Sequence, residues 1–396
     1  MRNLITAMLT LASGATLAQE TPPATEATPA TEASAIDERM TTAEGKVASI
    51  EEQLLEVKSS LSPLTKLKLS GYVQSRYQWE EARADETGGF NRFTVRRGRL
   101  KATYTTDIAE VMLQIDAVPT GVTLRDAEAT LFIPGTAQRM SVTLGQMKWP
   151  FGYEGPQSST EREFPERTRV VQTFLPSERD RGIRYSGKLG VLRLNVGVFD
   201  GNGTTFPGFV GIDNDKEKDV IGRVGFDLKL ISGGVSGWYG QTLGRAAGED
   251  FRHAHERSRI GADLQVYLDV LPFGATALKG EYIRGRTYVS GGAEMLDRVA
   301  SGWYALLVQN IGLSNTVAVR YDYFDPAHGL PTSADARDAT RPASTNPTGT
   351  LGVAASHHFG ENLKLTAAYE LPMQQTVEGA VEPKDNLLTV QLQARF

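Results

Sequence analysis

The stretch from residue 67 to residue 79 reads LKLSGYVQSRYQW. Its odd-numbered residues are apolar or small, and its even-numbered residues are mostly polar. Because successive side chains of a β-strand point to opposite faces, this alternation predicts a strand with one apolar and one polar face. A single strand of this kind fits the surface of a soluble sheet as well as the wall of a membrane barrel.

The same alternation recurs to the end of the chain. We count about 16 such stretches, many near 10 residues long, which is the repeat of an outer-membrane barrel. The sequence therefore predicts an all-β fold, a 16-stranded antiparallel transmembrane β-barrel over residues 66–396. Clear examples are residues 111–117, 192–198, 220–230, 260–268 and 388–396.

The links between these stretches alternate in length, which is an independent sign of the same fold. Outer-membrane barrels have tight periplasmic turns and long outer loops. Only the link near 119–121 is short where a long one is expected. Short links fall near 107–108, 134–138, 190, 231–232, 271–273, 311–313 and 360–361. Long links fall near 81–92, 149–181, 200–218, 244–256, 287–298, 325–348 and 373–384.

Composition excludes several other classes of protein. The chain has 396 residues, no Cys and a formal net charge of -5. The absence of Cys excludes a disulfide framework, cysteine catalysis and thiolate metal sites, and we expect no metal or cofactor. The acidic balance argues against nucleic acid as a partner. After the first 20 residues no stretch approaches the roughly 18 apolar residues that a membrane helix needs.

The first 35 residues predict export followed by a tether. Arg2 precedes a mostly apolar run over residues 4–17, and small residues at Thr16 and Ala18 fit a cleavage site, so residues 1–18 are expected to be a signal peptide. A buried N-terminal helix is the alternative. Residues 19–35 are rich in Pro, Thr, Ala and Glu, which predicts a flexible linker.

Residues 36–62 predict a periplasmic coiled-coil helix. Apolar residues there are spaced alternately four and three apart, with charged residues between them. Pro63 is expected to end the helix. β-branched residues such as Val47 and Ile50 on the seam favour three strands, and therefore a homotrimer. The alternative is one helix packed on its own chain. The seam residues are Ile36, Met40, Ala43, Val47, Ile50, Leu54, Val57 and Leu61.

An ordered set of short motifs over residues 66–396 resembles the family of phosphate-selective porins O and P. The resemblance implies a trimeric 16-stranded pore in the Gram-negative outer membrane that passes anions such as phosphate or pyrophosphate. The terminal aromatic Phe396 resembles the signal read by the barrel assembly machinery. The motifs are Arg96-Arg97-Gly98-Arg99-Leu100, Asp126-Ala127, residues 144–152 (LGQMKWPFG), Arg179-Asp180-Arg181-Gly182-Ile183, residues 199–203 (FDGNG), Gly280-Glu281-Tyr282 and residues 320–326 (RYDYFDP).

Basic residues on the polar face of the strands are the candidates for anion binding. Arg97, Arg99 and Lys101 are expected to form a ladder, one pleat apart, that faces the lumen. Guanidinium groups match two phosphate oxygens and stay charged. The other basic residues of this phase are Arg76, Arg184, Lys188, Arg193, Arg223, Arg259 and Arg320. The acids of the same phase are Asp116, Asp126, Glu128, Asp227, Asp263, Glu281 and Asp322.

The alternative is a self-neutralising pore wall in which these charges select little. On that interpretation the protein is a general, weakly selective porin. Arg76 is expected to stand alone among Gln side chains and to matter less than Arg99. Basic residues modestly outnumber acidic residues on the predicted lumen face, although the whole chain is acidic. We therefore favour the anion interpretation.

The longest link, residues 149–181, is a further candidate, because a long structureless connection is usually functional. In porins of this architecture the third outer loop folds into the pore. Lys148 directly precedes this link. The charged residues within it include Arg162, Arg167, Arg169, Arg179, Arg181, Glu154, Glu161, Glu163, Glu166 and Glu178. An ordinary exposed loop is the alternative.

Other functions have weaker support in the sequence. His253 and His255 share one face of an extended chain, but a polar loop explains them better than a metal site. The pair Ser356-His357 lacks an acid partner or a Gly-flanked nucleophile motif, so we predict no enzyme activity. A barrel that anchors a tether to the cell wall stays an alternative. We expect the partners to be small anions, outer-membrane lipid and two further copies of the chain.

Overall fold

The computed structural model describes residues 29–81, 89–176, 178–204, 216–244, 253–291, 294–328, 347–374 and 385–396. The chain divides into two compact units, residues 1–65 and residues 66–396. The predicted signal peptide and the first part of the predicted linker lie outside the described residues. Among the described residues, no helix combines the length and apolar character needed to cross a membrane.

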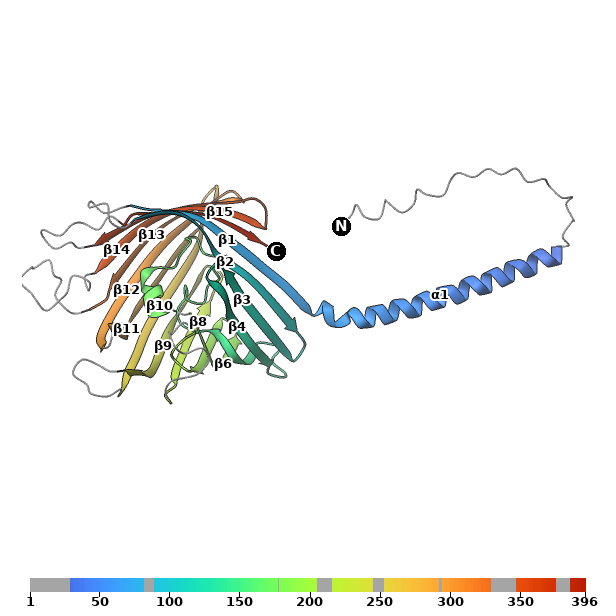
Figure 1. Ribbon diagram of the computed structural model, residues 1–396, viewed down its shortest axis with the longest axis horizontal. Coiled ribbons are helices and arrows are strands. Elements are labelled where there is room, and N and C mark those ends of the chain that lie inside the picture. Colours follow the sequence, from blue (N-terminus) through green and yellow to red (C-terminus); the bar gives the residue numbers. More distant parts are fainter. Residues whose placement is uncertain are drawn as a thin grey trace, which may run out of the picture. The chain divides into compact units, whose positions relative to one another are not determined.

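Residues 66–396 form one closed antiparallel barrel, and the prediction of 16 strands is confirmed. Each strand pairs with its neighbours in the sequence, and β1 pairs with β16 to close the sheet (Figure 1). Gly71 and Phe396 exchange two backbone hydrogen bonds of 3.0 Å at this closure. The strands are β1 Leu67–Glu80, β2 Phe90–Thr105, β3 Ala109–Val118, β4 Gly121–Phe132, β5 Met140–Lys148, β6 Arg179–Leu189, β7 Leu192–Phe199, β8 Asp219–Asp227, β9 Ile231–Gly244, β10 His253–Leu271, β11 Gly274–Gly291, β12 Glu294–Ile311, β13 Asn315–Asp325, β14 Thr348–His358, β15 Leu363–Gln374 and β16 Leu387–Arg395.

The barrel has apolar side chains outside and polar side chains inside. Leu69 and Ile260 are each at least 60% exposed, whereas Gln74 and Arg76 on the opposite phase are buried. This pattern is the reverse of a soluble protein's core. It is the pattern of a membrane barrel, because the outer face contacts lipid and the inner face contacts water and other polar groups.

Two predicted boundaries in the barrel are wrong. The link expected over residues 287–298 is instead a long hairpin, in which β11 reaches Gly291 and β12 begins at Glu294. Residues 287–291 pair in continuous register with residues 294–298, so the ladder extends beyond the apolar alternation that marks the membrane wall. The longest link covers residues 149–178 rather than 149–181, because β6 already begins at Arg179.

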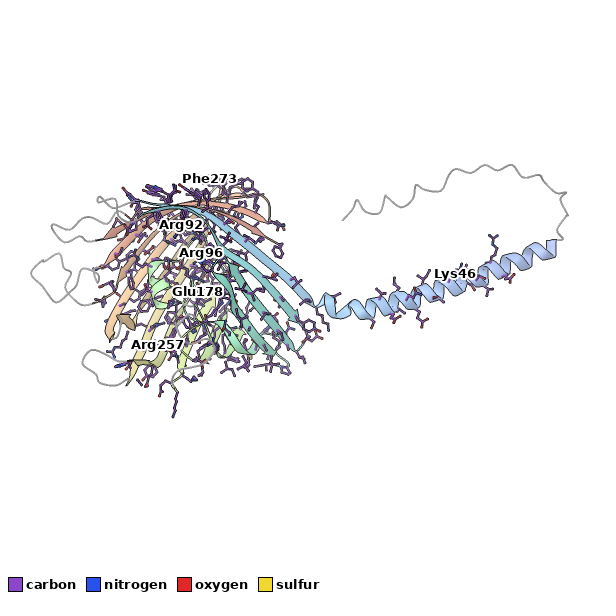
Figure 2. All side chains as sticks on the ribbon, in the orientation of Figure 1. Lys46, Arg92, Arg96, Glu178, Arg257 and Phe273 are labelled. Atoms are coloured by element: carbon purple, nitrogen blue, oxygen red, sulfur yellow. The ribbon has the colours of Figure 1, made fainter. Side chains whose placement is uncertain are left out.

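The first unit contains the helix α1, Pro29–Thr65. The helix begins within the predicted linker, since Pro is tolerated at the first position of a helix and the following Ala and Glu residues favour it. It also continues to Thr65, two residues past Pro63, whose missing N–H costs one hydrogen bond near the helix end. Side chains project from α1 around the helix (Figure 2), and Met40, Val47 and Ile50 are each more than half exposed.

Candidate functional site

Residues 149–178, described except for residue 177, run from β5 to β6 and fill one side of the barrel lumen; we call them the inner loop. The inner loop includes the short helix α2, Arg169–Phe174, which contacts β11, β12 and β13. Phe151, Phe164 and Phe174 are almost wholly buried in an apolar cluster with wall residues such as Trp238 and Ile283. The expectation of an inward-folded third loop therefore fits the structure, and the alternative of an exposed loop does not.

Polar groups of the wall hold the inner loop at many points. The Glu281 carboxylate of β11 accepts hydrogen bonds from the backbone N–H groups of Tyr153 and Glu154 at 3.3 and 3.1 Å. Lys279 Nζ lies 2.6 Å from Glu163 Oε1. Glu281 and Lys279 both lie on β11, whereas Arg76 of β1 contacts the loop residue Glu166, so the loop is held from separate parts of the wall. Further donors to loop carbonyls are Arg259 to Phe174, Arg320 to Glu166, and Lys364 to Arg162.

Two cavities lie beside β1–β4. One, of about 1280 Å³, lies toward the outer ends of these strands and is lined from both faces of the wall, with Tyr77, Phe93 and Val390 on the apolar face and Arg76 and Glu166 on the lumen side. The other, of about 390 Å³, lies toward their periplasmic ends. The polar lining of the larger includes Arg76, Arg92, Arg96, Arg125, Asp116, Glu166 and Gln172. The smaller is lined by Arg99, Lys101, Asp126, Glu128, Lys148, Arg184 and Arg395, among others.

Two β-bulges add arginines to this wall. In the β1–β2 pair, Gln74 faces Arg97 and Ser75 faces Val95, so Arg96 is the extra residue. In the β3–β4 pair the register skips Arg125 in the same way. A bulge breaks the strict alternation of faces, which is why both guanidinium groups reach the lumen next to a lumen-facing neighbour.

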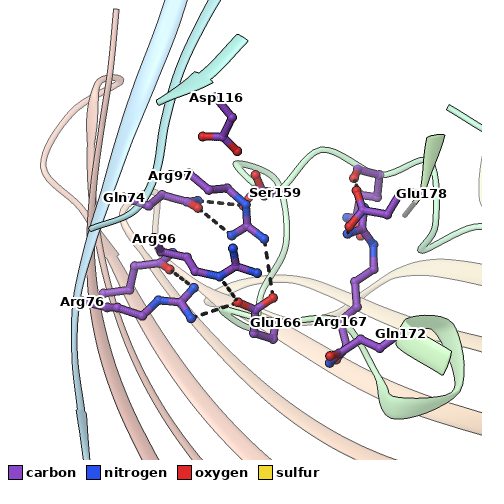
Figure 3. A network of polar contacts seen from close by, with 12 residues as sticks. Gln74, Arg76, Arg96, Arg97, Asp116, Ser159, Glu166, Arg167, Gln172 and Glu178 are labelled. Carbon is purple, nitrogen blue, oxygen red and sulfur yellow. Dashed lines mark hydrogen bonds and ion pairs between the residues drawn. The ribbon is translucent and has the colours of Figure 1, made fainter. Parts of the chain in front are cut away.

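Three guanidinium groups meet on one carboxylate of the inner loop (Figure 3). Glu166 lies 2.9 Å from Arg76 Nη1, 2.7 Å from Arg96 Nε and 3.5 Å from Arg97 Nη2. We call these four residues the arginine cluster. Arg97 also donates to Gln74 at 3.0 Å, and Arg76 to Gln391 at 2.8 Å. The expectation that Arg76 stands alone among Gln side chains is therefore wrong, because the inner loop brings Glu166 to it.

The predicted ladder continues from the arginine cluster toward the periplasmic end. Arg97, Arg99 and Lys101 face Gln74, Tyr72 and Ser70 of β1 in the register. Arg99 Nε lies 3.1 Å from Asp116 Oδ2, and Lys101 lines the smaller cavity.

Lys148 and Arg184 join the lining of the smaller cavity. Lys148 Nζ donates to the carbonyl of Pro156 at 2.7 Å, and Arg184 Nη1 donates to the carbonyl of Lys148 at 3.3 Å. Arg184 Nη2 is 3.8 Å from Glu128 Oε2. Lys148 therefore ties the start of the inner loop to this wall beside the smaller cavity.

The remaining predicted site residues are bound to acids, and all except Arg320, which donates to the carbonyl of Glu166, lie apart from the cluster. Arg179 is fully buried and makes two hydrogen bonds to Asp126, of 2.8 and 3.1 Å. It was predicted to line the passage, but its charge is directed to Asp126 instead. Arg223 makes a similar pair with Asp263, at 2.9 and 2.6 Å. Arg193 pairs with Asp227, and Arg320 with Glu370. For these four arginines the self-neutralising wall is the better description.

Acids of the inner loop stay ionised because several arginines surround each of them. Burial opposes the ionisation of Glu166, but Arg97, Arg96, Arg162 and Arg76 outweigh burial and hold its pKa well below the usual range. Burial likewise opposes the ionisation of Glu178, while Arg167, Arg179, Arg162 and Arg125 lower its pKa to about 2. Both carboxylates therefore carry a full negative charge at neutral pH.

Arg96, Arg125 and the position of Glu166 were missed by sequence reasoning. Strict alternation assigns Arg96 and Arg125 to the lipid face, where an arginine costs about 2–4 kcal/mol. The adjacent charges in Arg96-Arg97 and Arg125-Asp126 were the available signal, because two consecutive charged residues cannot both avoid lipid on a regular strand. The position of Glu166 depends on the path of the inner loop, which no local pattern reveals.

The family match agrees with the motifs. A family model described as phosphate-selective porin O and P matches residues 114–216, which include β4, β5, the inner loop and β6. The matched residues are similar to this porin family. This match and the barrel fold indicate a channel of the Gram-negative outer membrane. A comparison with curated proteins gives no match.

Solved outer-membrane barrels share the fold at low sequence identity. An anion-selective porin from Comamonas acidovorans aligns with a TM-score of 0.59 and 13% identity over 83% of this chain and 99% of that one. The channel DcaP of Acinetobacter baumannii aligns with a TM-score of 0.59 and 15% identity over 83% and 97%. OmpT of Vibrio cholerae, in a trimer form, gives 0.57 and 11% over 83% and 99%.

No group of three or more His, Asp or Glu side chains in the described part of the chain is arranged to hold a metal ion. His253 and His255 lie on β10, opposite Gly244 and Thr242 of β9.

Proposed function

We propose that the protein is a passive outer-membrane channel for small anions of the phosphate type. The observation that carries this proposal is the arginine cluster, in which three guanidinium groups face one carboxylate beside the larger cavity. Arg99, Lys101, Lys148 and Arg184 continue the basic wall around the smaller cavity. An anion that follows this wall exchanges one set of donors for the next.

Guanidinium groups suit this role because their planar donors match two oxygens of a phosphate or carboxylate group. Conduction also requires that each contact be weak enough to release the ion. The family description and the name of the Comamonas porin agree with anion passage. Arg223, Arg257 and Arg320 on β8–β13 pair with acids, as do Arg99 and Arg184 on β2 and β6. What distinguishes β1 and β2 is that three of their arginines share one carboxylate.

The expected result for the wild-type protein is an anion-selective current. In a planar bilayer with a KCl gradient, the reversal potential should have the sign set by chloride. Addition of phosphate should reduce the chloride current, because both anions use the same guanidinium groups. A reversal potential near zero, with phosphate and chloride equally permeant, would favour the general, weakly selective porin.

A homotrimer held partly by α1 is a second proposal. Met40, Val47, Ile50, Leu54 and Val57 follow the heptad seam, and each is more than half exposed. A helix of this length with one apolar seam is stabilised by packing against other helices. The OmpT structure in a trimer form is consistent with assembly of three barrels. A tether to the cell wall is the alternative use of this helix.

Deletion of residues 36–61 should lower the temperature at which trimers dissociate to monomers in detergent. The reason is that the apolar contacts among the three copies of the seam would be lost. Heated and unheated samples on a gel, or light scattering with temperature, measure this change. The double substitution Ile50→Asn/Leu54→Asn should act in the same direction, whereas Glu51→Gln/Glu52→Gln should have little effect. Equal trimer stability in all variants would exclude α1 as a clamp.

A further inference from the structure

The carboxylate of Glu166 occupies the position in the arginine cluster that a permeating oxyanion would need. It receives contacts of 2.9, 2.7 and 3.5 Å from Arg76, Arg96 and Arg97, from two adjacent strands (Figure 3). These are the donors and distances that bind a free carboxylate or phosphate. A solute anion can therefore use the three arginines fully only when Glu166 leaves.

The backbone and the side chain of Glu166 are held differently. Its carbonyl oxygen accepts a hydrogen bond of 3.0 Å from Arg320 Nη1 of β13, a different part of the wall from β1 and β2. Its side chain is 27% exposed and lines the larger cavity. The carboxylate can therefore move by side-chain rotation while the inner loop stays in place.

Arg162 offers a second position for this carboxylate. Its side chain is buried, with 3% exposed, and none of its three guanidinium nitrogens has a hydrogen-bond partner among the described residues. A buried and unpaired charge is costly, so a mobile carboxylate nearby would be attracted to it. Arg162 interacts electrostatically with Glu166 and with Arg97, which places it beside the cluster.

We infer that Glu166 is a tethered competitor that a permeating oxyanion displaces from the arginine cluster toward Arg162. The inference rests on the proposed anion function. With the cluster empty, Glu166 pairs with Arg76, Arg96 and Arg97; with an oxyanion bound, Glu166 pairs with Arg162. Binding stays weak enough for the anion to leave because the anion must displace Glu166, and the partner that Arg162 gains offsets part of this cost.

The variant Glu166→Gln should make inorganic phosphate a stronger inhibitor of the chloride current. Glutamine keeps the size and the hydrogen-bonding oxygen but removes the competing charge. Contacts of charged groups of this kind correspond to about a tenfold change in affinity, so we expect half-inhibition at roughly one tenth of the wild-type phosphate concentration. Glu163→Gln is the matched control, since Glu163 lies in the same loop but pairs with Lys279 on the opposite wall.

Arg162→Met tests the second position. In the wild-type background it should weaken inhibition by phosphate, because displaced Glu166 loses its new partner. In the Glu166→Gln background the same change should have little further effect, because the carboxylate through which Arg162 acts is already gone. This double-mutant cycle measures the coupling between the two residues. An equal effect in both backgrounds would mean that Arg162 acts through its general field, and the exchange would be rejected.

The outcomes separate this inference from the proposed function. If wild-type channels select anions but Glu166→Gln behaves like Glu163→Gln, the competitor role of Glu166 is wrong and the anion channel stands. If wild-type channels do not select anions, both fall. Single-channel conductance of wild-type size in each variant shows that the inner loop has kept its place.

Discussion

Replacement of both Arg97 and Arg99 by Glu should turn the channel from anion preference to cation preference. Arg97 touches Glu166 and Gln74, and Arg99 touches Asp116. The double substitution makes the charge of this wall more negative by four units. The new carboxylates also lie next to the carboxylates of Glu166 and Asp116. At such short range each charge is worth about 1 kcal/mol or more, so the ratio of anion to cation permeability should fall by about tenfold or more.

The measurement is the reversal potential across a KCl gradient, with wild type and variant in the same lipid. Lys188→Glu/Arg193→Glu is the matched control, because it makes the same change of charge on exposed residues of the β6–β7 hairpin. The control should shift the reversal potential much less. If Arg97→Glu/Arg99→Glu leaves it unchanged at normal conductance, these residues only line the wall and the inner loop carries the selectivity.

The barrel could be predicted from sequence because its signal is local. Alternation in stretches such as residues 67–79 reports which face of each strand meets lipid, and link lengths report the topology. The boundaries were less certain where strands extend beyond the membrane, as at Gly291 and Glu294, since pairing there does not need an apolar face. At Pro29 the helix begins within a segment whose composition predicts a linker.

The site could be predicted only in part, because its geometry depends on contacts between distant residues. Regular alternation gave Arg97, Arg99 and Lys101, but it cannot give bulges such as those at Arg96 and Arg125. Nor does it give partners such as Arg259 and the carbonyl of Phe174, which lie far apart in the chain. Arg179 was assigned to the passage for the same reason, because its contact with Asp126 joins residues that are far apart in the chain.

Removal of the inner loop should open the lumen and produce a several-fold rise in single-channel conductance. Lys148 and Arg179 are opposite each other in the β5–β6 register, and the N–H of Trp149 donates to the carbonyl of Glu178 at 3.1 Å. The two strand ends are therefore close enough for a short Asn-Gly turn in place of residues 150–177, with the hairpin unchanged. Chloride selectivity should fall at the same time, because Arg76, Arg96 and Arg97, left without Glu166, would face a wide aqueous channel in which charges are screened.

The same variant should be less stable than the wild type, because the loop residues Phe151, Phe164 and Phe174 are lost from the apolar cluster in the lumen. Each such side chain contributes about 1.5–3 kcal/mol when it is buried. Barrel formation is checked by heat-dependent mobility on a gel before conductance is compared. Wild-type conductance in a folded barrel without residues 150–177 would mean that ions do not pass beside the inner loop. In that case the cavities along β1–β4 are not the conducting path, and the basic wall has another role.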